Sequence, residues 1–467
     1  MNVPLVEPPS TGAYDFPSLL IKGYFDNPNQ PYKLAGPKSD LILLPPRYAG
    51  ELGTYGSSKL SFGAAIHDFW VSPHTTWRYH LDDETGRQTL MGSFKRNGAN
   101  IVRQLDEEII LAFSQWRDVT DHWTELAINP SIRPLINQTF GRVLVGAPLC
   151  RSKEWLDCAS GLGLKLMLAA RDLRGFPSWA QPWVKHFLPT YRALMRARRP
   201  LVRLSEPLVR KKMLGLGMEK INGREDHDMI NYQIKHAVGW RAMDVDFHTG
   251  QLFDNVFAGD NQLVNALLQC IYDLAAHPEY HEPLRDEIRA VCGKDDQLTI
   301  ETLARLRRVD SFMKEVVRLR PGTLIVMARK ALVDVTLSDG LVVPRGVTVA
   351  MPSFALNHDP SIYGDDAAEF KPFRFVQDDQ EGDFTKVTPA HLAFESTVGA
   401  GLDFGRGKAT CPGRYYALWV MKVVFVRFVL NYEVKLKPGA ERPPNIDANV
   451  HKIANLQGDI LIRRLQC

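Results

Sequence analysis

The chain has 467 residues, of which 45% are hydrophobic and 24% are charged. This composition is ordinary for a globular protein and excludes a largely disordered chain. The formal net charge of +4, with acidic and basic residues interspersed, is too small to indicate nucleic-acid binding, although it allows a local basic patch. Length alone suggests two or three domains, a weak expectation because large single folds exist.

The cysteines and the N-terminal residues bear on the cell compartment. The six cysteines, at positions 150, 158, 270, 292, 411 and 467, form no CxxC pair and no metal-ligand spacing. This pattern disfavours a disulfide framework or a structural zinc site and favours a reducing compartment. Residues 1–14 are polar and carry Pro8 and Pro9, unlike a signal peptide. No apolar run approaches the ~18 residues that a membrane span requires.

The first two thirds of the chain predict a small sheet followed by a helical body. Residues 15–75 mix short apolar runs with turn residues, which predicts a small sheet and a helix. From Thr76 to about Arg320, apolar residues recur at i, i+3 and i+4, as in amphipathic helices. One helix is expected over DCASGLGLKLMLAARDL, residues 157–173. Another should end at His277, because a residue before proline leaves the helical region.

The last third returns partly to strands. Residues 331–350 alternate around Ser338-Asp339-Gly340, which predicts a β-hairpin. Residues 351–410 are rich in loops, and a long helix is expected from Pro412 to about Leu430. The segments VKLKP and GDILIRRL predict strands of a final small sheet. We therefore expect one integrated domain over residues 1–467, mainly α with a minor β portion.

The stretch FGRGKATCPGR, residues 404–414, places one cysteine among glycines and basic side chains. A phosphate loop is excluded, because Leu402 and Ala409 stand where that motif needs glycine and Ser or Thr. Pro412 suits a first helical turn, so the helix N-terminus and nearby cations should lower the pKa of the Cys411 thiol. Such a thiolate suits axial ligation of haem iron. The alternative is a buried structural cysteine.

A second set of charged residues lies upstream of this stretch. Glu315 and Arg318 are three residues apart on an expected helix, so they share a face and can pair. Arg374 follows a proline-bounded loop and could reach the same carboxylate. Taken singly, such pairs are more often exposed surface pairs.

Three motifs now stand in order: ExxR at Glu315–Arg318, FxPxRF at Phe370–Phe375 and FGxGxxxCPGR at Phe404–Arg414. Together they resemble the signatures of cytochrome P-450 haem-thiolate enzymes, over nearly the whole chain. RVLVGAPLCRSKEWL and YDLAAHPEYHEPLRDEI are similar to stretches of filamentous-fungal members. The resemblance implies the cytochrome P-450 fold, in which long distal and proximal helices sandwich haem b, and monooxygenase-type oxidoreductase activity.

The resemblance also implies roles for individual residues. Cys411 would be the axial iron ligand, with Phe404 against the haem. Glu315, Arg318 and Arg374 would form a triad that holds the cysteine loop. Other expected cofactor-binding residues are Gly405, Gly413, Arg329, Arg96 and Arg406, with Arg329 and Arg96 as haem propionate partners. The family commonly has His or Arg where this chain has Ala409, so one propionate contact is missing or comes from Arg406 or Lys408.

The expected distal helix departs from the family pattern [AG]Gx[DE]T[TS], reading Ala258-Gly259-Asp260-Asn261-Gln262-Leu263. Asn261 and Gln262 replace the acid and the threonine, and Asp260 is one residue, ~100°, off register. These three are the expected catalytic residues, yet an amide has no comparable acid–base couple for relaying protons. Ordinary oxygen insertion and unusual oxidation (desaturation, ring closure or coupling) both stay open. Further alternatives are a redox-neutral isomerase or cyclase and a non-catalytic haem-binding sensor.

The resemblance implies a substrate pocket built from residues 60–80, 257–266, 322–327 and 446–452. Its apolar, aromatic composition predicts a hydrophobic small molecule, such as a terpenoid, polyketide or alkaloid intermediate of fungal secondary metabolism. His451 is expected to be a solvated loop histidine. The expected substrate contacts are Phe69, Trp70, Trp77, Val256, Phe257, Ala258, Thr323, Ile325, Val326 and Val450.

Partners and location also follow from the resemblance. Fungal relatives usually carry an N-terminal helix in the endoplasmic reticulum membrane, face the cytosol and receive electrons from NADPH–cytochrome P-450 reductase. This chain begins after the place of that helix, so either an anchor was removed or the protein is naturally soluble and cytosolic. We expect a monomer. Arg406, Lys408, Arg414 and Lys422 are expected to form a basic patch for an acidic electron donor.

Overall fold

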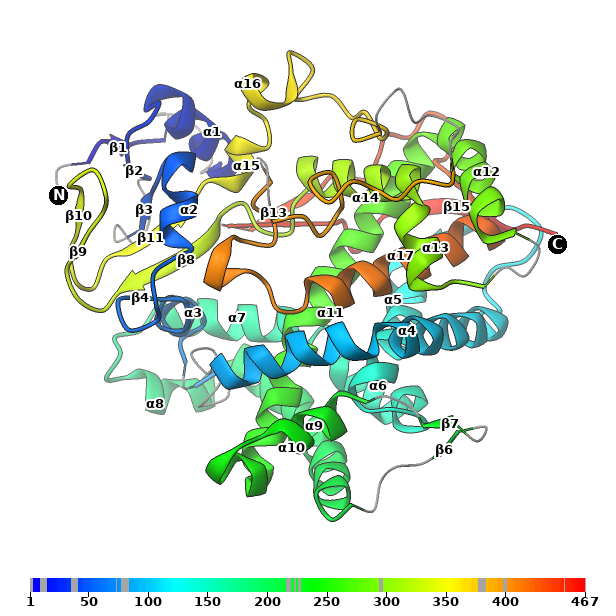
Figure 1. The fold of residues 1–467 in the computed structure, drawn as a ribbon, viewed down its shortest axis with the longest axis horizontal. Helices are drawn as coiled ribbons and strands as arrows, with labels where there is room; N and C mark the ends of the chain where they lie inside the picture. The colour runs from blue at the N-terminus through cyan, green and yellow to red at the C-terminus, as the bar shows by residue number, and fades with distance from the viewer. Residues whose placement is uncertain are drawn as a thin grey trace.

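The computed structural model describes residues 3–8, 15–34, 41–72, 74–76, 84–215, 220–221, 224–225, 228–293, 297–376, 384–397, 401–448 and 450–466. Within these ranges the protein is mainly helical, which confirms the predicted fold class. Figure 1 shows most of the strands gathered at one side of the molecule, beside the N-terminal segment, and the long helices filling the rest.

The helices have the following bounds: α1 (Phe16–Asp26), α2 (Ala49–Leu52), α3 (Phe62–Trp70), α4 (Glu84–Gln115), α5 (Ile128–Leu144), α6 (Lys153–Ala159), α7 (Leu162–Arg174), α8 (Gln181–Val184), α9 (Pro189–Met213), α10 (Met229–His236), α11 (Val245–Ala276), α12 (His281–Cys292), α13 (Ile300–Arg305), α14 (Arg307–Leu319), α15 (Ser353–Leu356), α16 (Pro360–Tyr363) and α17 (Arg414–Asn431). The strands are β1 (Leu5–Val6), β2 (Tyr32–Leu34), β3 (Leu41–Leu43), β4 (Leu60–Ser61), β5 (Thr124–Ala127), β6 (Lys220–Ile221), β7 (Arg224–Glu225), β8 (Val326–Ala331), β9 (Val335–Thr336), β10 (Val342–Val343), β11 (Thr348–Met351), β12 (Tyr432–Lys435), β13 (Ile446–Ala448), β14 (His451–Ile453) and β15 (Asp459–Arg464).

The largest sheet joins the N-terminal segment to the last third of the chain. Its strand order is β1-β2-β3-β11-β8-β4. β11 runs parallel to β3 and antiparallel to β8, so residues far apart in sequence share one core. Along β8, buried and half-buried residues alternate, as expected for a strand with one covered face. This sheet carries one wall of the candidate site.

The helical body is organised around α11. This helix contacts α5, α7, α9, α14 and α17, and Figure 1 shows it running through the middle of the molecule. Its apolar residues belong to the largest hydrophobic core, together with residues of α4, α5, α7 and α17. α17 is buried all round, from Leu418 to Val429, and even its Lys422 and Arg427 are covered. A helix of this kind is stabilised by packing on several sides rather than by one apolar stripe.

Several predicted elements are confirmed. The hairpin around Ser338-Asp339-Gly340 is β9–β10, with Gly340 at φ 87°. α11 ends at Ala276 before the His277-Pro278 pair. The two final strands pair antiparallel as β12 and β15, with β5 as their third strand.

Two predicted boundaries were wrong. The single helix expected over residues 157–173 is split, because Ser160 is extended and Gly161 takes φ 67°. Glycine adopts this left-handed conformation without strain. It interrupts the helix, and α7 begins at the next residue, Leu162. The helix expected from Pro412 starts two residues later, at Arg414, with Gly413 as its N-cap.

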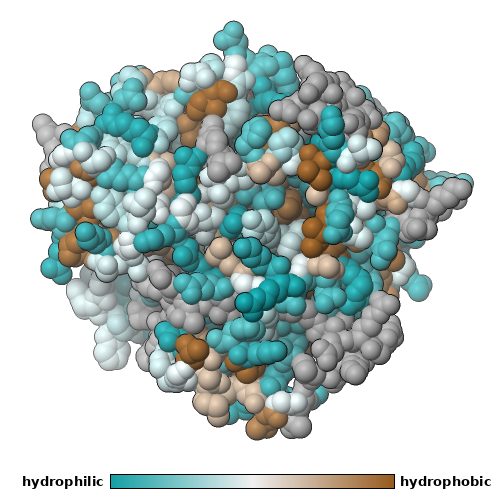
Figure 2. Space-filling model, in the orientation of Figure 1, coloured by the Kyte–Doolittle hydropathy of each residue, from teal (hydrophilic) through white to brown (hydrophobic). Residues whose placement is uncertain are grey.

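The surface shown in Figure 2 carries hydrophobic residues in small groups scattered among hydrophilic ones. Among the described residues, no helix is both long and apolar enough to cross a membrane.

Candidate active site

The loop that carries Cys411 is fixed by backbone contacts. Cys411 N donates to the carbonyl of Phe404 over 2.8 Å, which closes the loop on itself. Lys408 N donates to the carbonyl of Gly53 over 2.8 Å, which docks the loop on the end of α2. Gly407 has φ 64°, and a Cβ there would overlap the Gly53 backbone, so this approach requires glycine.

The pKa of the Cys411 thiol differs from the sequence-based expectation. Burial raises it, and the backbone N–H groups of Gly413 and Arg414, together with the Arg414 charge, offset only part of that effect. The expected lowering was wrong, because desolvation outweighs the helix terminus. A cation bound to the sulfur would reverse this balance, since a metal deprotonates a coordinating thiol.

A buried charge cluster lies behind the loop. Arg318 donates to both carboxylate oxygens of Glu315, from Nε over 2.7 Å and from Nη2 over 2.8 Å. Arg374 Nε donates to the same carboxylate over 3.0 Å. Glu315 is 0% and Arg318 2% exposed, so each buried charge is stabilised by the other. The structure thus brings together the three residues expected to form a triad.

Asn357 connects this cluster to the segment before the cysteine loop. Its amide donates to the carbonyl of Arg318 over 3.1 Å and to the carboxylate of Asp403 over 3.4 Å. Asp403 directly precedes Phe404. The position of the cysteine loop is therefore coupled to the Glu315–Arg318 ion pair of α14.

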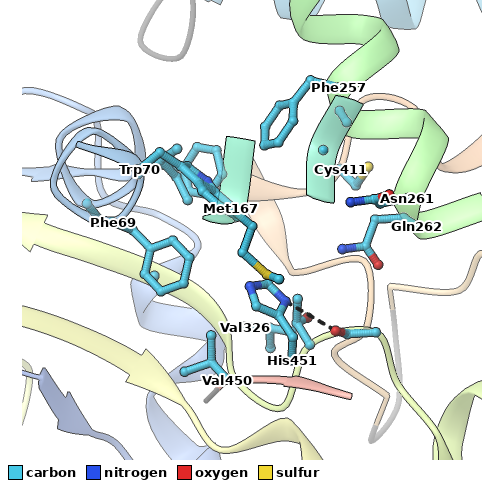
Figure 3. Close-up of a pocket in the computed structure, with 18 of the residues that line it drawn as sticks. Phe69, Trp70, Met167, Phe257, Asn261, Gln262, Val326, Cys411, Val450 and His451 are labelled. Carbon is cyan, nitrogen blue, oxygen red and sulfur yellow. Dashed lines mark hydrogen bonds between the residues drawn. The ribbon is translucent and has the colours of Figure 1, made fainter. Parts of the chain in front are cut away.

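A cavity of about 1660 Å³ lies between the cysteine loop, α11, α3, α7 and β8. Cys411, Phe404, Gly405 and Gly413 line it from the loop. Figure 3 shows Cys411 and residues of α11 around the same space. The expected substrate contacts that line this cavity are Phe69, Trp70, Phe257, Ala258, Thr323, Ile325, Val326 and Val450.

Two other expected contacts fall elsewhere. Val256 is 1% exposed within the helical core and does not line the cavity, because it lies on another face of α11 from Phe257 and Ala258. Trp77 lies outside the described residues.

Phe69, Trp70 and Phe257 form an aromatic wall of the cavity, and their rings are in contact. The rings of Trp70 and Phe257 meet edge to face at 5.3 Å, and those of Phe69 and Trp70 at 4.8 Å. Such contacts hold aromatic side chains in defined positions. The wall is therefore a preformed apolar surface.

The three expected catalytic residues of α11 do not all face the cavity. Asn261 and Gln262 line the cavity. A Cβ on Gly163 would overlap the Asn261 amide, and one on Gly322 would overlap Oε1 of Gln262, so both amides are packed against glycines. Asp260 does not line the cavity; it is 1% exposed and pairs with Arg133 of α5 at 3.1 Å. One residue of helix rotation turns Asp260 away from the cavity wall, while its partner Arg133 lines the cavity.

Only some of the basic residues expected to contact the cofactor line the cavity. Arg329 and Lys408 line the cavity. Arg96 is exposed on α4 and does not line it, whereas Arg87 of the same helix does. Arg406 likewise is not among the cavity residues.

The basic patch expected around the thiolate is smaller than predicted. Lys422 is 2% exposed and pairs with Asp310 over 2.6 Å inside the core, so it cannot meet a partner protein. Arg414 stacks on the ring of Tyr415 at 4.3 Å. Lys408 remains exposed.

Sequence reasoning did not point to Arg87, Met167 or Arg174, which are among the cavity residues, and it misjudged His451. His451 is not a solvated loop residue; it begins β14 and lines the cavity. The helical spacing of Met167 and Arg174 gave no sign of which side of α7 faces the cavity. For His451, the alternation of the β13–β14 hairpin was the available signal.

These residues fit the group that the resemblance implies. Cys411 is the one cysteine among the described cavity residues, which matches a single thiolate ligand, and Gly405 and Gly413 leave room beside the backbone. Arg87, Arg329 and Lys408 supply positive charge to the same cavity, as the carboxylates of a haem require.

Comparisons with known proteins indicate the family and the fold. A family model described as Cytochrome P450 matches residues 85–462. Cytochrome P450 monooxygenase AN1598 of Emericella nidulans is 28% identical over 95% of this chain and 82% of its own length. Cytochrome P450 monooxygenase BOA4 of Botryotinia fuckeliana is 28% identical over 97% of this chain and 90% of its own length. The fold matches the solved structure of retinoic acid bound cyanobacterial CYP120A1, with a TM-score of 0.68 and 17% identity over 93% of this chain and 92% of that one. The chain therefore belongs to the cytochrome P450 family of monooxygenases.

Proposed function

We propose that this chain binds haem b in the cavity and oxidises a hydrophobic small molecule, an intermediate of fungal secondary metabolism. The observation that carries the proposal is that Cys411 and the Ala258-Gly259 pair of α11 line one cavity with an aromatic wall. When bound, the haem supplies the redox chemistry on dioxygen, with electrons from NADPH–cytochrome P-450 reductase. The chain acts as a single catalytic domain and as a monomer.

In this proposal Cys411 Sγ would hold the haem iron, and Phe404 and Gly405 would be next to the cofactor. The Glu315–Arg318–Arg374 cluster keeps the cysteine loop in position through Asn357. These residues fix the sulfur rather than react.

Arg329, Lys408 and Arg87 are the proposed partners of the haem propionates. All three line the cavity. Charge-assisted hydrogen bonds from Arg are especially strong and directional. Arg87 takes the part that the sequence assigned to Arg96, and Lys408 replaces the contact missing at Ala409.

Gln262 and Asn261 orient water or substrate in the cavity rather than transfer protons themselves, because neutral amides lack an acid–base couple. Asp260 has no such role in this proposal, because it does not line the cavity and is paired with Arg133. Proton delivery then depends on water. The proposed outcome is an oxidation without oxygen transfer, such as desaturation, ring closure or coupling. Hydroxylation with a water-borne proton is the competing outcome.

A position on the endoplasmic reticulum membrane, facing the cytosol, is also part of the proposal. Trp179, Trp183 and Phe187 are 78%, 74% and 74% exposed. They lie in the segment whose Ser178 and Gln181 line the cavity. Exposed aromatic residues of this kind favour a membrane interface, from which an apolar substrate could enter.

The first experiment tests the ligand. Purified protein and the Cys411→Ser variant are reduced under carbon monoxide, with Cys292→Ser as the matched control, because Cys292 lies outside the cavity. We expect the absorption typical of sulfur-ligated haem in the parent and the control and its loss in Cys411→Ser. Retention of that absorption and of activity in Cys411→Ser would overturn the proposal.

The second experiment tests the reaction. Candidate pathway intermediates are supplied with reductase and NADPH, and products, oxygen and NADPH consumption are measured for the parent and Gln262→Thr. We expect oxidised products without inserted oxygen from the parent and a shift toward hydroxylation in Gln262→Thr. Turnover without NADPH would point to an isomerase or cyclase, and failure of every apolar ligand to shift the Soret band would point to a sensor.

A further inference from the structure

His451 has a fixed backbone at the cavity wall. It forms an antiparallel bridge with Thr323, and Leu324 N donates to the neighbouring carbonyl of Val450 over 2.7 Å. These contacts join β14 to the segment before β8. The position of the His451 side chain is therefore set by sheet pairing rather than by a free loop.

The ring of His451 is held by aromatic neighbours. It meets Phe69 edge to face at 5.8 Å and lies nearly parallel to Trp70 at 6.0 Å, with an angle of 28° between the planes. Figure 3 shows the ring in the cavity with its hydrogen bond to a backbone carbonyl. A ring held in this way has one orientation before any ligand arrives.

The hydrogen-bond partner of one ring nitrogen determines the role of the other. Nδ1 lies 3.3 Å from the carbonyl oxygen of Gly322. A carbonyl oxygen only accepts, so Nδ1 carries the proton. Burial lowers the pKa of His451, the bond to Gly322 opposes that shift, and the nearby Arg174 charge adds to it. The ring is then neutral, and Nε2 presents a lone pair.

This Nε2 atom is buried and has no hydrogen-bond partner among the described residues. A buried acceptor without a partner costs free energy that a bound donor would recover. Because the surrounding wall is aromatic, no neighbouring side chain of that wall competes for the lone pair.

We propose that His451 is a specificity-determining residue whose Nε2 accepts a hydrogen bond from a hydroxyl group of the substrate. The substrate is then an apolar molecule that already carries a hydroxyl, placed against Phe69 and Trp70. The inference rests on the proposed function, because it takes this cavity as the substrate site. It also implies that an earlier oxidation or reduction in the pathway supplies the hydroxyl.

The test uses three probes: naphthalene, 2-naphthol and 2-methoxynaphthalene. Their dissociation constants are measured by calorimetry on haem-loaded protein, with the Soret shift as a second readout. The variants are His451→Phe, which keeps an aromatic ring, and His451→Gln, which keeps an acceptor. His122→Phe is the matched control, since its side chain is 89% exposed.

We expect the parent and His122→Phe to prefer 2-naphthol over 2-methoxynaphthalene by about 3- to 10-fold, the range of one hydrogen bond. His451→Phe should lose that preference while still binding naphthalene, and His451→Gln should regain part of it. An unchanged preference in His451→Phe, or no preference in the parent, would overturn the inference and leave the cavity assignment intact. Failure of the parent to bind any of the three would overturn both.

Discussion

Arg133 Nη1 donates to Oδ1 of Asp260 over 3.1 Å and thereby ties α5 to the distal helix α11. The carboxylate is 1% and the guanidinium 15% exposed, so the pair lies inside the protein. Burial raises the pKa of Asp260, while the Arg133 charge, the side chain of Asn137 and the backbone N–H of Gly161 lower it. Asp260 itself does not line the cavity, although Arg133 does.

Asp260→Asn is therefore expected to weaken the fold and not the reaction. Removing one charge of a largely buried pair should lower the free energy of unfolding by about 3 kcal/mol. Turnover per haem-loaded molecule should stay within twofold of the parent. Urea unfolding and product analysis check the two parts, with the exposed Asp118→Asn as control. Normal stability together with lost turnover would contradict the scaffold role.

Glu315→Gln should be among the most damaging single changes. The variant would leave Arg318, 2% exposed, without the carboxylate that accepts its two hydrogen bonds. The expected loss is about 3–5 kcal/mol, with poor retention of haem. Glu369→Gln is the matched control, because its side chain is 70% exposed. Equal unfolding midpoints for the two variants would show that the buried cluster is dispensable.

Gly407→Ala tests the docking of the cysteine loop. A methyl group there would overlap the Gly53 backbone, and φ 64° strains any other residue by about 1–2 kcal/mol. The loop should shift, and the carbon monoxide spectrum should lose its sulfur-ligated form. Gly50→Ala provides the control, since a Cβ at Gly50 meets open space within helix α2. We expect it to stabilise the protein slightly; identical spectra for both variants would contradict the prediction.

His281 should make the protein sensitive to acid. Its Nε2 lies 3.1 Å from the carbonyl of Val434, and its Nδ1 lies 3.2 Å from Nη2 of Arg285. Nε2 therefore donates, Nδ1 accepts, and the ring is neutral. Burial and the Arg285 charge lower the pKa of His281 from 6.5 to about 4.

The sign of the effect follows from proton binding. Between pH 6.5 and 4 the unfolded chain holds a proton on this residue and the folded one does not, so stability falls as the pH falls through that range. The full loss is about 3 kcal/mol. His281→Gln keeps a donor and an acceptor but does not titrate, so its urea midpoint should change less between pH 7 and pH 5. Parallel pH dependence for the two proteins would contradict this assignment.

The sequence was informative where the chemistry is local or repeated. Alternation around Gly340 predicted the β9–β10 hairpin, and the His277-Pro278 pair predicted the end of α11. Glu315 and Arg318 are three residues apart, so their pairing follows from helix geometry. The sequence indicated only that Arg374 could reach the same carboxylate, and the triad itself was implied by the resemblance to the family.

Long-range packing explains what the sequence did not predict. Spacing cannot tell whether Arg87 or Arg96 faces the cavity, because both lie on one helix whose neighbours set its rotation. Lys422 was expected to be a surface charge, but it forms an ion pair with Asp310 and donates to the carbonyl of Leu303 inside the core. The position of His451 is set by its pairing with Thr323, a contact between segments that are distant in the sequence.

The helix α11 serves two purposes with adjacent residues. Asp260 is committed to the framework through Arg133, whereas Asn261 and Gln262 look into the cavity. Substitutions at the inward positions therefore leave the ion pair that secures the helix intact. Evolution can therefore change the reaction by substitutions at Asn261 and Gln262 without altering the fold.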